Sequence, residues 1–405
     1  MSFRYIAGLL GKAPVVVGPV GGEGGSAPGA WNLSSQANLQ AQGLWPQPPL
    51  PKQLWSWGES QFGELGLGNL TNYSSPKQIG SETVWAQVST GRNLSFAIKL
   101  SGTMWSWGLN SVGALGLNSA TYSFSTPQQI GALTTWYQVS SGSNCCYAIK
   151  TDGTLWAWGQ NTQGKLGIGN STTYSSPKQV GVATNWAKVS GGAGSAYAIK
   201  TGGTLWSWGA NGQGQLGLND TTYRNSPVQI GALTTWSKVS SGNSFCAAIK
   251  TDGTLWTWGM NYFGQLGLGN TVYRSSPLQV GALTNWYEIA GGTNSLFAVK
   301  TDGTLWGWGK NSAGELGLGN TTYAFSSPQQ IGSLTNWLNI SSGNYYCLAL
   351  KTDKTLWSWG SGSTGKLGLG NTTNYSSPKQ VGALTTWLKL PIAIGSTHSI
   401  AIKSP

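Results

Sequence analysis

One pentapeptide, a Leu or Met followed by Trp, a small residue, Trp and Gly, occurs seven times in this chain of 405 residues. The copies begin at positions 54, 104, 155, 205, 255, 305 and 356, so the period is 50 or 51 residues. A fixed period of this size is typical of solenoids, arrays and propellers, in which each repeat is one supersecondary unit. The fold must therefore be built from seven equivalent units.

Each unit carries the signals of four short strands. In the third unit these are expected at 186–190, 195–200, 205–209 and 226–230. Pro227 suits an outer edge strand, because proline has no N–H to donate to a neighbour. The turn before the Trp strand is Thr-Asp-Gly-Thr in several units, which favours a type I′ hairpin. The sequence predicts an all-β fold, a seven-bladed β-propeller with four-stranded antiparallel blades.

The tryptophans fit the stacking of blades. The two Trp of each pentapeptide point to one face of a strand and the small residue between them to the other. We expect the bulky face to meet small residues on the neighbouring blade. Seven units with three Trp each account for 21 of the 23 in the chain. The tryptophans are therefore expected to form the core.

The two ends of the repeat region complete each other. The first Trp strand has no Ala-Ile-Lys-like strand before it, and such a strand stands alone at 399–403. The C-terminal strand should pair with the first blade and close the ring, which removes exposed sheet edges. We assign residues 1–51 to an N-terminal arm and 52–405 to the propeller.

Charge is scarce but unbalanced: 8% of the residues are charged, and the net charge is +12. So polar and uncharged a surface is typical of secreted or virion-exposed β proteins. No apolar run is long enough for membrane insertion. Seven lysines share one repeat position next to the Asp-Gly turn. They form either a basic ring for an acidic partner or a solubilising feature, and the second is favoured, because no Arg cluster supports binding of nucleic acid.

Nothing in the sequence indicates an enzyme. The four cysteines lack metal-ligand spacing, and three of them share a repeat position that holds small or apolar residues in other units. His398 is the only histidine, so no Ser-His-Asp or Cys-His set is available. We predict no catalytic, cofactor or metal site.

The repeat resembles that of the regulator of chromosome condensation family. Its pattern of Asp-Gly, aromatic-x-Trp-Gly, Asn-x-x-Gly-Gln-Leu-Gly-Leu-Gly and a later Pro recurs through residues 52–405. The family's Gly-x-x-His is matched at Gly395 to His398, which is therefore expected to be structural. The resemblance implies the propeller fold but leaves function open, because related proteins exchange nucleotide on a small GTPase, inhibit β-lactamase or sense UV-B. The photoreceptor's Gly-Trp-Arg-His-Thr motif is absent.

The arm suggests one function. Its Gly-x-Trp-x-Leu … Gly-x-Trp-Pro segment, with a short helix expected after Ser34, resembles a segment of structural proteins of tailed bacteriophages. That resemblance implies a non-enzymatic virion structural or attachment protein. It would contact other virion proteins through an anchor of Trp31, Leu33, Leu44 and Trp45, and a host receptor or glycan through the propeller. The alternative is a secreted or cytoplasmic module that binds, inhibits or regulates another protein, as an exchange factor does.

Variable loop positions are the candidates for partner binding. Most repeat positions are nearly identical between units and serve the scaffold, whereas the loops after Trp-Gly and after the Ser-Gly break differ from unit to unit. Large aromatic residues in such loops are typical of interface cores. The candidate partner-binding residues are Gln61, Phe62, Arg92, Tyr262, Phe263 and Tyr345. Alternatively, these aromatic side chains fold back over the rim of a blade.

Overall fold

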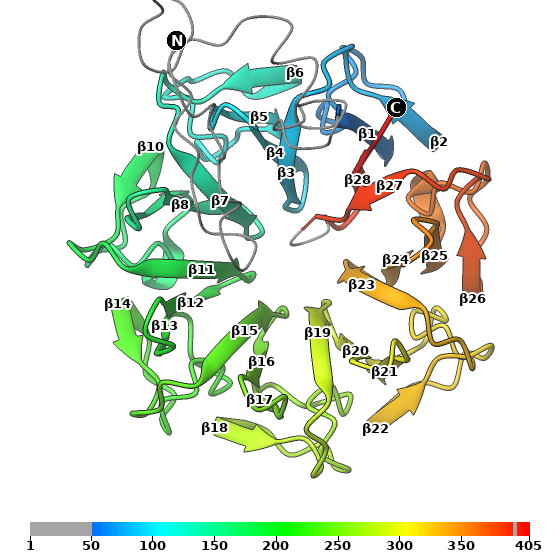
Figure 1. Ribbon diagram of the computed structural model, residues 1–405. Coiled ribbons are helices and arrows are strands. Elements are labelled where there is room, and N and C mark those ends of the chain that lie inside the picture. Colours follow the sequence, from blue (N-terminus) through cyan, green and yellow to red (C-terminus); the bar gives the residue numbers. More distant parts are fainter. Residues whose placement is uncertain (1–50, 392–394) are drawn as a thin grey trace, which may run out of the picture. The chain divides into compact units, whose positions relative to one another are not determined.

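The computed structural model describes residues 51–391 and 395–405, and Pro51–Pro405 form one compact unit. Seven four-stranded antiparallel sheets are arranged as blades around a central axis (Figure 1). This confirms the predicted seven-bladed propeller. The predicted arm and its helix lie outside the described residues, apart from Pro51.

Within a blade, the innermost strand begins at the third Trp of the unit and the outermost strand carries the proline. The first and last blades are β27 (Trp387–Lys389), β28 (His398–Lys403), β1 (Gln53–Gly58), β2 (Tyr73–Gln78), and β23 (Trp337–Ser342), β24 (Tyr346–Lys351), β25 (Leu356–Gly360), β26 (Tyr375–Gln380). The next two blades are β3 (Trp85–Thr90), β4 (Leu94–Lys99), β5 (Met104–Leu109), β6 (Ser123–Gln129), and β7 (Trp136–Ser141), β8 (Cys145–Lys150), β9 (Leu155–Gly159), β10 (Tyr174–Gln179). The remaining blades are β11 (Trp186–Gly191), β12 (Ser195–Lys200), β13 (Leu205–Gly209), β14 (Arg224–Gln229); β15 (Trp236–Ser241), β16 (Phe245–Lys250), β17 (Leu255–Gly259), β18 (Arg274–Gln279); and β19 (Trp286–Gly291), β20 (Ser295–Lys300), β21 (Leu305–Lys310), β22 (Ala324–Gln330).

Helical structure is limited to two short 3₁₀ turns among the described residues, Thr162–Gly164 and Ser363–Gly365. No helix in this part of the chain has the length and apolarity needed to cross a membrane.

The expected strands of the third unit are present, but the predicted turn type is wrong. Only the glycine of the Asp-Gly pair has a positive φ, 77° at Gly153, whereas a type I′ turn needs positive φ at both central residues. Asp152 keeps an ordinary backbone because its carboxylate accepts bonds from the Thr154 N–H (2.9 Å) and hydroxyl (2.7 Å). The result is a tight turn followed by a left-handed glycine.

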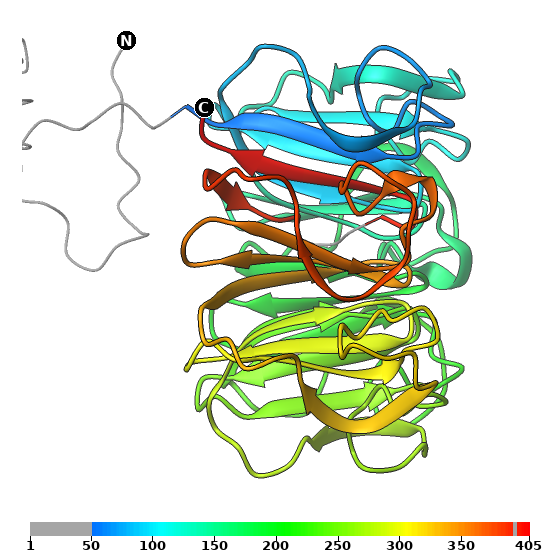
Figure 2. The same ribbon diagram turned by 90° about the vertical axis from the view of Figure 1, so that its right-hand side faces the viewer.

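The ring closes as predicted. One sheet has the order β2-β1-β28-β27, so the last strand of the chain pairs with the first. The two strands are antiparallel and in continuous register from Gln53 opposite Lys403 to Gly58 opposite His398. They lie side by side in both views (Figure 1 and Figure 2). The first blade is therefore built from both ends of the propeller.

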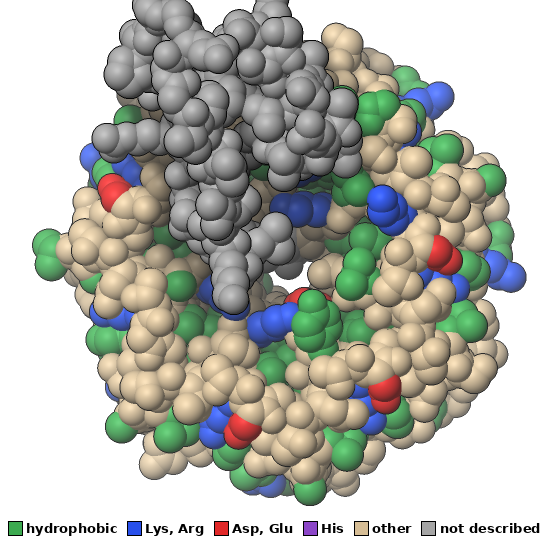
Figure 3. Space-filling model, viewed as in Figure 1, with side chains coloured by type: hydrophobic (Ala, Val, Ile, Leu, Met, Phe, Trp, Pro, Cys, Tyr) green, Lys and Arg blue, Asp and Glu red, His purple; other side chains and the backbone are tan. Residues whose placement is uncertain are grey.

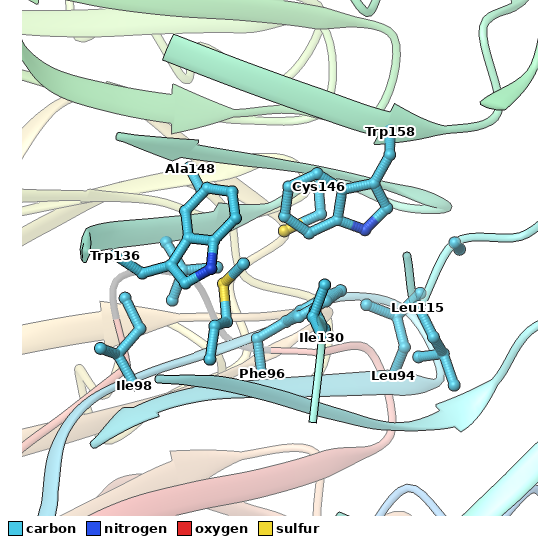
Figure 4. Packing of buried hydrophobic residues seen from close by; sticks show 12 residues of the cluster. Leu94, Phe96, Ile98, Leu115, Ile130, Trp136, Cys146, Ala148 and Trp158 are labelled. Atoms are coloured by element: carbon cyan, nitrogen blue, oxygen red, sulfur yellow. The ribbon is translucent and has the colours of Figure 1, made fainter. Parts of the chain in front are cut away.

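The hydrophobic core lies between the blades. Trp136 and Trp158 on one blade pack against the preceding blade, which contributes Phe96, Ile98 and Leu115 (Figure 4). The same arrangement recurs around the ring. The expected contact of Trp with small residues is thus only part of the packing, because large aliphatic and aromatic side chains share the opposing face.

The second Trp of the pentapeptide also joins neighbouring blades by a hydrogen bond. The indole N–H of Trp208 donates to the backbone carbonyl of Lys165 in the preceding blade at 2.9 Å. Its ring lies against Gly167 (φ 75°), where an added Cβ would come within 2.7 Å of the indole nitrogen. Trp57 makes the same bond, at 3.0 Å to the Lys366 carbonyl, across the closing seam.

We predict that deleting residues 395–405 abolishes cooperative unfolding, because the deletion removes β28 and leaves the edges of β1 and β27 unpaired. Thermal unfolding followed by circular dichroism tests this. Deleting Pro405 alone is the control, since it leaves β28 intact. An unchanged thermal midpoint in the longer deletion would contradict closure by this strand.

We predict that Trp208→Phe lowers the free energy of unfolding by about 2–4 kcal/mol, because it removes the bond between blades and part of a fully buried ring. Trp206→Phe is the matched control: Trp206 is half-buried, and its N–H donates within its own blade to Thr204. Urea unfolding should show less than half the loss for the control. Equal losses would mean that the bond between blades contributes little.

Candidate protein-binding site

The propeller has two faces with different connections. On the loop face lie the segments between the innermost and second strands, such as 192–194, and between the third and outermost strands, such as 210–223. On the turn face lie the turns between the second and third strands, such as 201–204, and the links to the next blade. All six candidate partner-binding residues lie on the loop face, because each belongs to one of its segments.

Three of these candidates belong to one aromatic cluster, made by Tyr262, Phe263, Tyr323, Tyr345 and Lys310. Tyr262 is 63% exposed, and its ring lies edge-on to Phe263 with centroids 4.8 Å apart. The ring of Phe263 lies 5.7 Å from that of Tyr323, which is 60% exposed. The ammonium of Lys310 lies between Phe263 and Tyr345, 5.2 Å from the centre of the Phe263 ring and 4.6 Å from that of the Tyr345 ring.

The cluster contains both exposed aromatic side chains and one that folds back over the rim of a blade. Phe263 is half-buried and folds back against the next blade, whereas Tyr262 and Tyr323 project from the surface. Sequence reasoning missed Tyr323, because a tyrosine stands at or next to this position in every unit and the search was for variable residues. Lys310 could have been found, since the residue after Trp-Gly varies.

Tyr345 holds a strained backbone. Its φ is +63°, a left-handed conformation that is costly for a bulky residue, on the order of 1–2 kcal/mol. The equivalent residues of other blades include Asn144 and Asn294, which are absent from the left-handed set. Strain that only one blade carries is a reason to examine its loop for function.

The loop that carries Tyr262 and Phe263 is rigidly supported. The side chain of Asn261 accepts a bond from the Leu266 N–H (2.9 Å) and donates to two carbonyls of the same loop. The N–H of Phe263 donates to the Gln265 side chain at 2.9 Å. A preorganised loop loses little conformational entropy when a partner binds.

The other three candidates lie elsewhere on this face. Phe62 packs on Tyr122, with ring centroids 6.0 Å apart, and Gln61 is exposed beside it. Arg92 is exposed at the central channel, where a cavity of about 100 Å³ is lined by the Ser-Gly and Gly-Gly breaks of the blades. These residues belong to the first units of the ring, and the structure does not join them to the aromatic cluster.

Each loop between the third and outermost strands contains a buried side chain that stands between a Gly and a Leu. In Gln215 the amide oxygen accepts the Gln213 N–H at 2.9 Å. Glu64 makes the same bond to the Phe62 N–H (2.7 Å), but its second carboxylate oxygen is buried without a partner. Burial therefore raises the pKa of Glu64 to about 7, and it also raises the pKa of Glu315, its counterpart in another blade.

The ring of seven lysines lies on the turn face, and its ammonium groups pack on tryptophan. In Lys150 the nitrogen lies 3.7 Å from the centre of the Trp156 ring and 5.1 Å from that of Trp136. Burial lowers the pKa of Lys150, and the charge of Asp152 partly offsets that effect. Six of the seven lysines lie over two indoles in this way. These cation–π contacts favour a structural role over an open basic ring.

The one Ser–His contact is not arranged for nucleophilic catalysis. The Ser95 hydroxyl donates to the Glu64 carbonyl at 2.9 Å, so it accepts from Nε2 of His398 at 2.8 Å. A catalytic histidine must instead take the proton of the serine. Both side chains are fully buried, and burial lowers the pKa of His398 to about 3. The contact joins the closing strand to the next blade.

The remaining sequence-predicted residues need only brief mention. The four cysteines are free and buried. Among residues 51–391 and 395–405, no group of three or more His, Cys, Asp or Glu is placed to hold a metal ion. The anchor residues Trp31, Leu33, Leu44 and Trp45 lie outside the described residues.

The fold and the loop geometry define a closed seven-bladed propeller with repeat-encoded blades. The RCC1-like domain family matches residues 51–287 and 182–405, so the chain belongs to this family. Its fold is similar to that of yeast RCC1 (Prp20), solved bound to Kap60, with a TM-score of 0.78 and 21% identity over 88% of this chain and 89% of that one. Human WBSCR16 gives a TM-score of 0.78 at 18% identity, over 87% of this chain and all of the other.

Curated relatives match over a shorter stretch. The ultraviolet-B receptor UVR8 of Arabidopsis thaliana is 31% identical over 122 residues, which are 29% of this chain and 27% of the receptor. The human E3 ubiquitin-protein ligase HERC2 is 28% identical over 122 residues, 2% of its length. The chain thus aligns with under a third of either relative.

We predict that Glu64→Gln stabilises the protein by about 1–2 kcal/mol at a pH of about 8 and leaves it nearly unchanged at about 4. The folded state binds the proton more tightly than the unfolded state, so wild-type stability is lost as the pH rises through about 7. Gln215→Glu is the matched reverse change and should create the same loss. Urea unfolding at both pH values checks this, and a pH-independent difference would contradict it.

Proposed function

We propose that this propeller is a non-catalytic protein-binding module and that the aromatic cluster of the loop face contacts its partner. The observation that carries the proposal is that cluster: the exposed Tyr262 and Tyr323, the half-buried Phe263 and Tyr345, and Lys310 come from three neighbouring blades. Tyrosine gives a large amphipathic contact area at low cost in side-chain entropy. Tyr262 and Tyr323 have the largest exposed fractions, 63% and 60%, among the aromatic residues that the structure describes.

The comparisons support protein binding as the class of function. Yeast RCC1 was solved in complex with Kap60, and a second yeast structure is described with its binding to Gsp1p and histones. Kap60, Gsp1p and histones are partners of the yeast proteins. For this chain they support only the class of activity, which is protein binding. A regulator or inhibitor that docks a partner on one face of a rigid ring fits both the family and the cluster.

The virion role is a narrower form of the same proposal, because an attachment protein also binds through exposed loops. None of the reported relatives is a virion protein, and the arm residues on which that role depends lie outside the described residues. We therefore place protein binding first and keep the virion role, like the extracellular or cytoplasmic alternative, as a prediction.

Site-specific photo-crosslinking tests the proposal. A benzophenone amino acid at position 262 or 323 should crosslink one specific protein in an extract of the producing organism. The control position is Tyr223, which is 50% exposed at the place equivalent to Tyr323, whereas the residue equivalent to Phe263 in the preceding blade is Gln163. The double variant Tyr262→Ser/Tyr323→Ser should reduce capture by about 30-fold or more, since interface aromatics contribute on the order of 1–2 kcal/mol each.

The same variants separate binding from folding. Because both tyrosines are exposed, we expect the thermal midpoint to fall by no more than about 2 °C. Unchanged capture by the double variant, or equal crosslinking from position 223, would contradict a role for the aromatic cluster.

A further inference from the structure

A second polar ring lines the central channel on the turn face. It is formed by the residue two positions after the third Trp of each unit, near the start of each innermost strand. We call it the channel-mouth ring. Its members are Gln87, Gln138, Lys188, Lys238, Glu288, Asn339 and Lys389.

Most of these side chains reach the next innermost strand. Gln138 accepts from the Val189 N–H (3.1 Å) and donates to the Val189 carbonyl (3.3 Å). Lys389 donates to the Ala86 carbonyl at 3.0 Å, and Lys188 donates to the Ser237 carbonyl. Since a neutral Gln makes this link between blades with two bonds, the link itself does not require a positive charge.

The lysines therefore bring charge that the scaffold does not need. The ring holds three Lys and one Glu, and that Glu288 is paired with Lys238 at 2.8 Å. Lys188 and Lys389 are exposed, and no carboxylate among the described residues forms a salt bridge with either. Burial is the main cause that lowers the pKa of Lys188 and of Lys389; repulsion by Lys238 and by Lys52 adds to it, and Glu288 partly offsets it at Lys188. Basic side chains surround the central opening in Figure 3, which views the face where the C-terminus lies.

This cluster differs from the other lysine ring of the same face. The ammonium groups of that ring lie over indoles and beside aspartates such as Asp152. At the channel mouth, in contrast, the ammonium groups of Lys188 and Lys389 bond backbone carbonyls of the neighbouring innermost strand and lie over no indole of the described residues. An incoming carboxylate would compensate these positive charges, which burial at present disfavours.

Exposed apolar surface lies next to the ring. Tyr137 and Tyr287, one residue before the ring position, are 50% and 47% exposed, and Leu338 at the equivalent place is 40% exposed. The Tyr287 ring lies 4.0 Å from the ammonium of Lys238. Carboxylates and short apolar side chains of one peptide could be contacted here together.

We propose that the turn-face mouth of the channel binds a short acidic peptide segment of a partner protein, with its carboxylates on Lys188, Lys238 and Lys389. The observation behind this is the placement of three lysines, only one of them paired, around one opening beside exposed Tyr and Leu. A long polyanion such as nucleic acid fits less well, because Glu288 lies within the ring and four aspartates of the turns surround it on the same face. This site is separate from the aromatic cluster, which lies on the opposite face.

Fluorescence anisotropy with a labelled short poly-glutamate peptide tests the proposal on the full chain. The variant Lys188→Gln/Lys389→Gln removes two charges and installs the residue that Gln87 and Gln138 already provide, so the links between blades should persist. The matched control, Lys77→Gln/Lys178→Gln, removes two charges from the outermost strands. We expect saturable binding at about 50 mM salt, about tenfold weaker in the channel variant and less than about twofold weaker in the control.

Four results would overturn the proposal. Equal weakening in both variants would show that only net charge matters. Absence of saturable binding to the poly-glutamate peptide would show that the mouth does not take acidic segments. Tighter binding of a single-stranded oligothymidylate, lost in the channel variant, would assign the mouth to nucleic acid instead. A poly-glutamine peptide should not bind in any case, and its binding would equally contradict a charge-based site.

Discussion

The hydrogen bond from one indole to the preceding blade is the interaction on which the ring depends. The second Trp of the pentapeptide inserts below the Gly-x-Leu-Gly loop of its neighbour, and its N–H bonds a carbonyl there at 2.9–3.0 Å in five blades. In the other two blades, Trp158 and Trp258 occupy the same place, but their indole N–H groups have no hydrogen-bond partner among the described residues. Because Trp57 makes this bond to the Lys366 carbonyl, the first and last units are held together in the same way as the four other pairs of blades that have it.

A scaffold of this kind leaves few positions free for recognition. The Trp, Gly and Leu positions are fixed by close approach between blades, and the turn lysines are held on indoles. Positions that vary between blades include the loops of one face and the start of the innermost strands on the other. The aromatic cluster and the channel-mouth ring are two places where variable positions bring aromatic or basic side chains together.

Low charge does not make the ring electrostatically neutral. Acidic residues number 11 against 23 basic ones, and several of the acids are used in turns or buried. Glu64 shows the cost of placing a carboxylate where two other blades carry Gln: one carboxylate oxygen has no partner, and the pKa of Glu64 rises. Repeat proteins tolerate such a residue because its cost stays within one blade and its neighbours.

The sequence alone determined the number of blades, the four strands in each and the closing strand, because each is encoded by a periodic pattern of apolar residues, Gly and Pro. It also selected Tyr262, Phe263 and Tyr345 as partner-binding candidates, since they vary where the scaffold does not. The turn type was misjudged, because the Asp152 side chain competes for the backbone in a way that residue identity does not reveal. Only the tertiary structure decided that Tyr323 and Lys310 join those aromatics while Gln61, Phe62 and Arg92 do not. That grouping arises between loops of neighbouring blades, and distances between units are set by packing rather than by the repeat pattern.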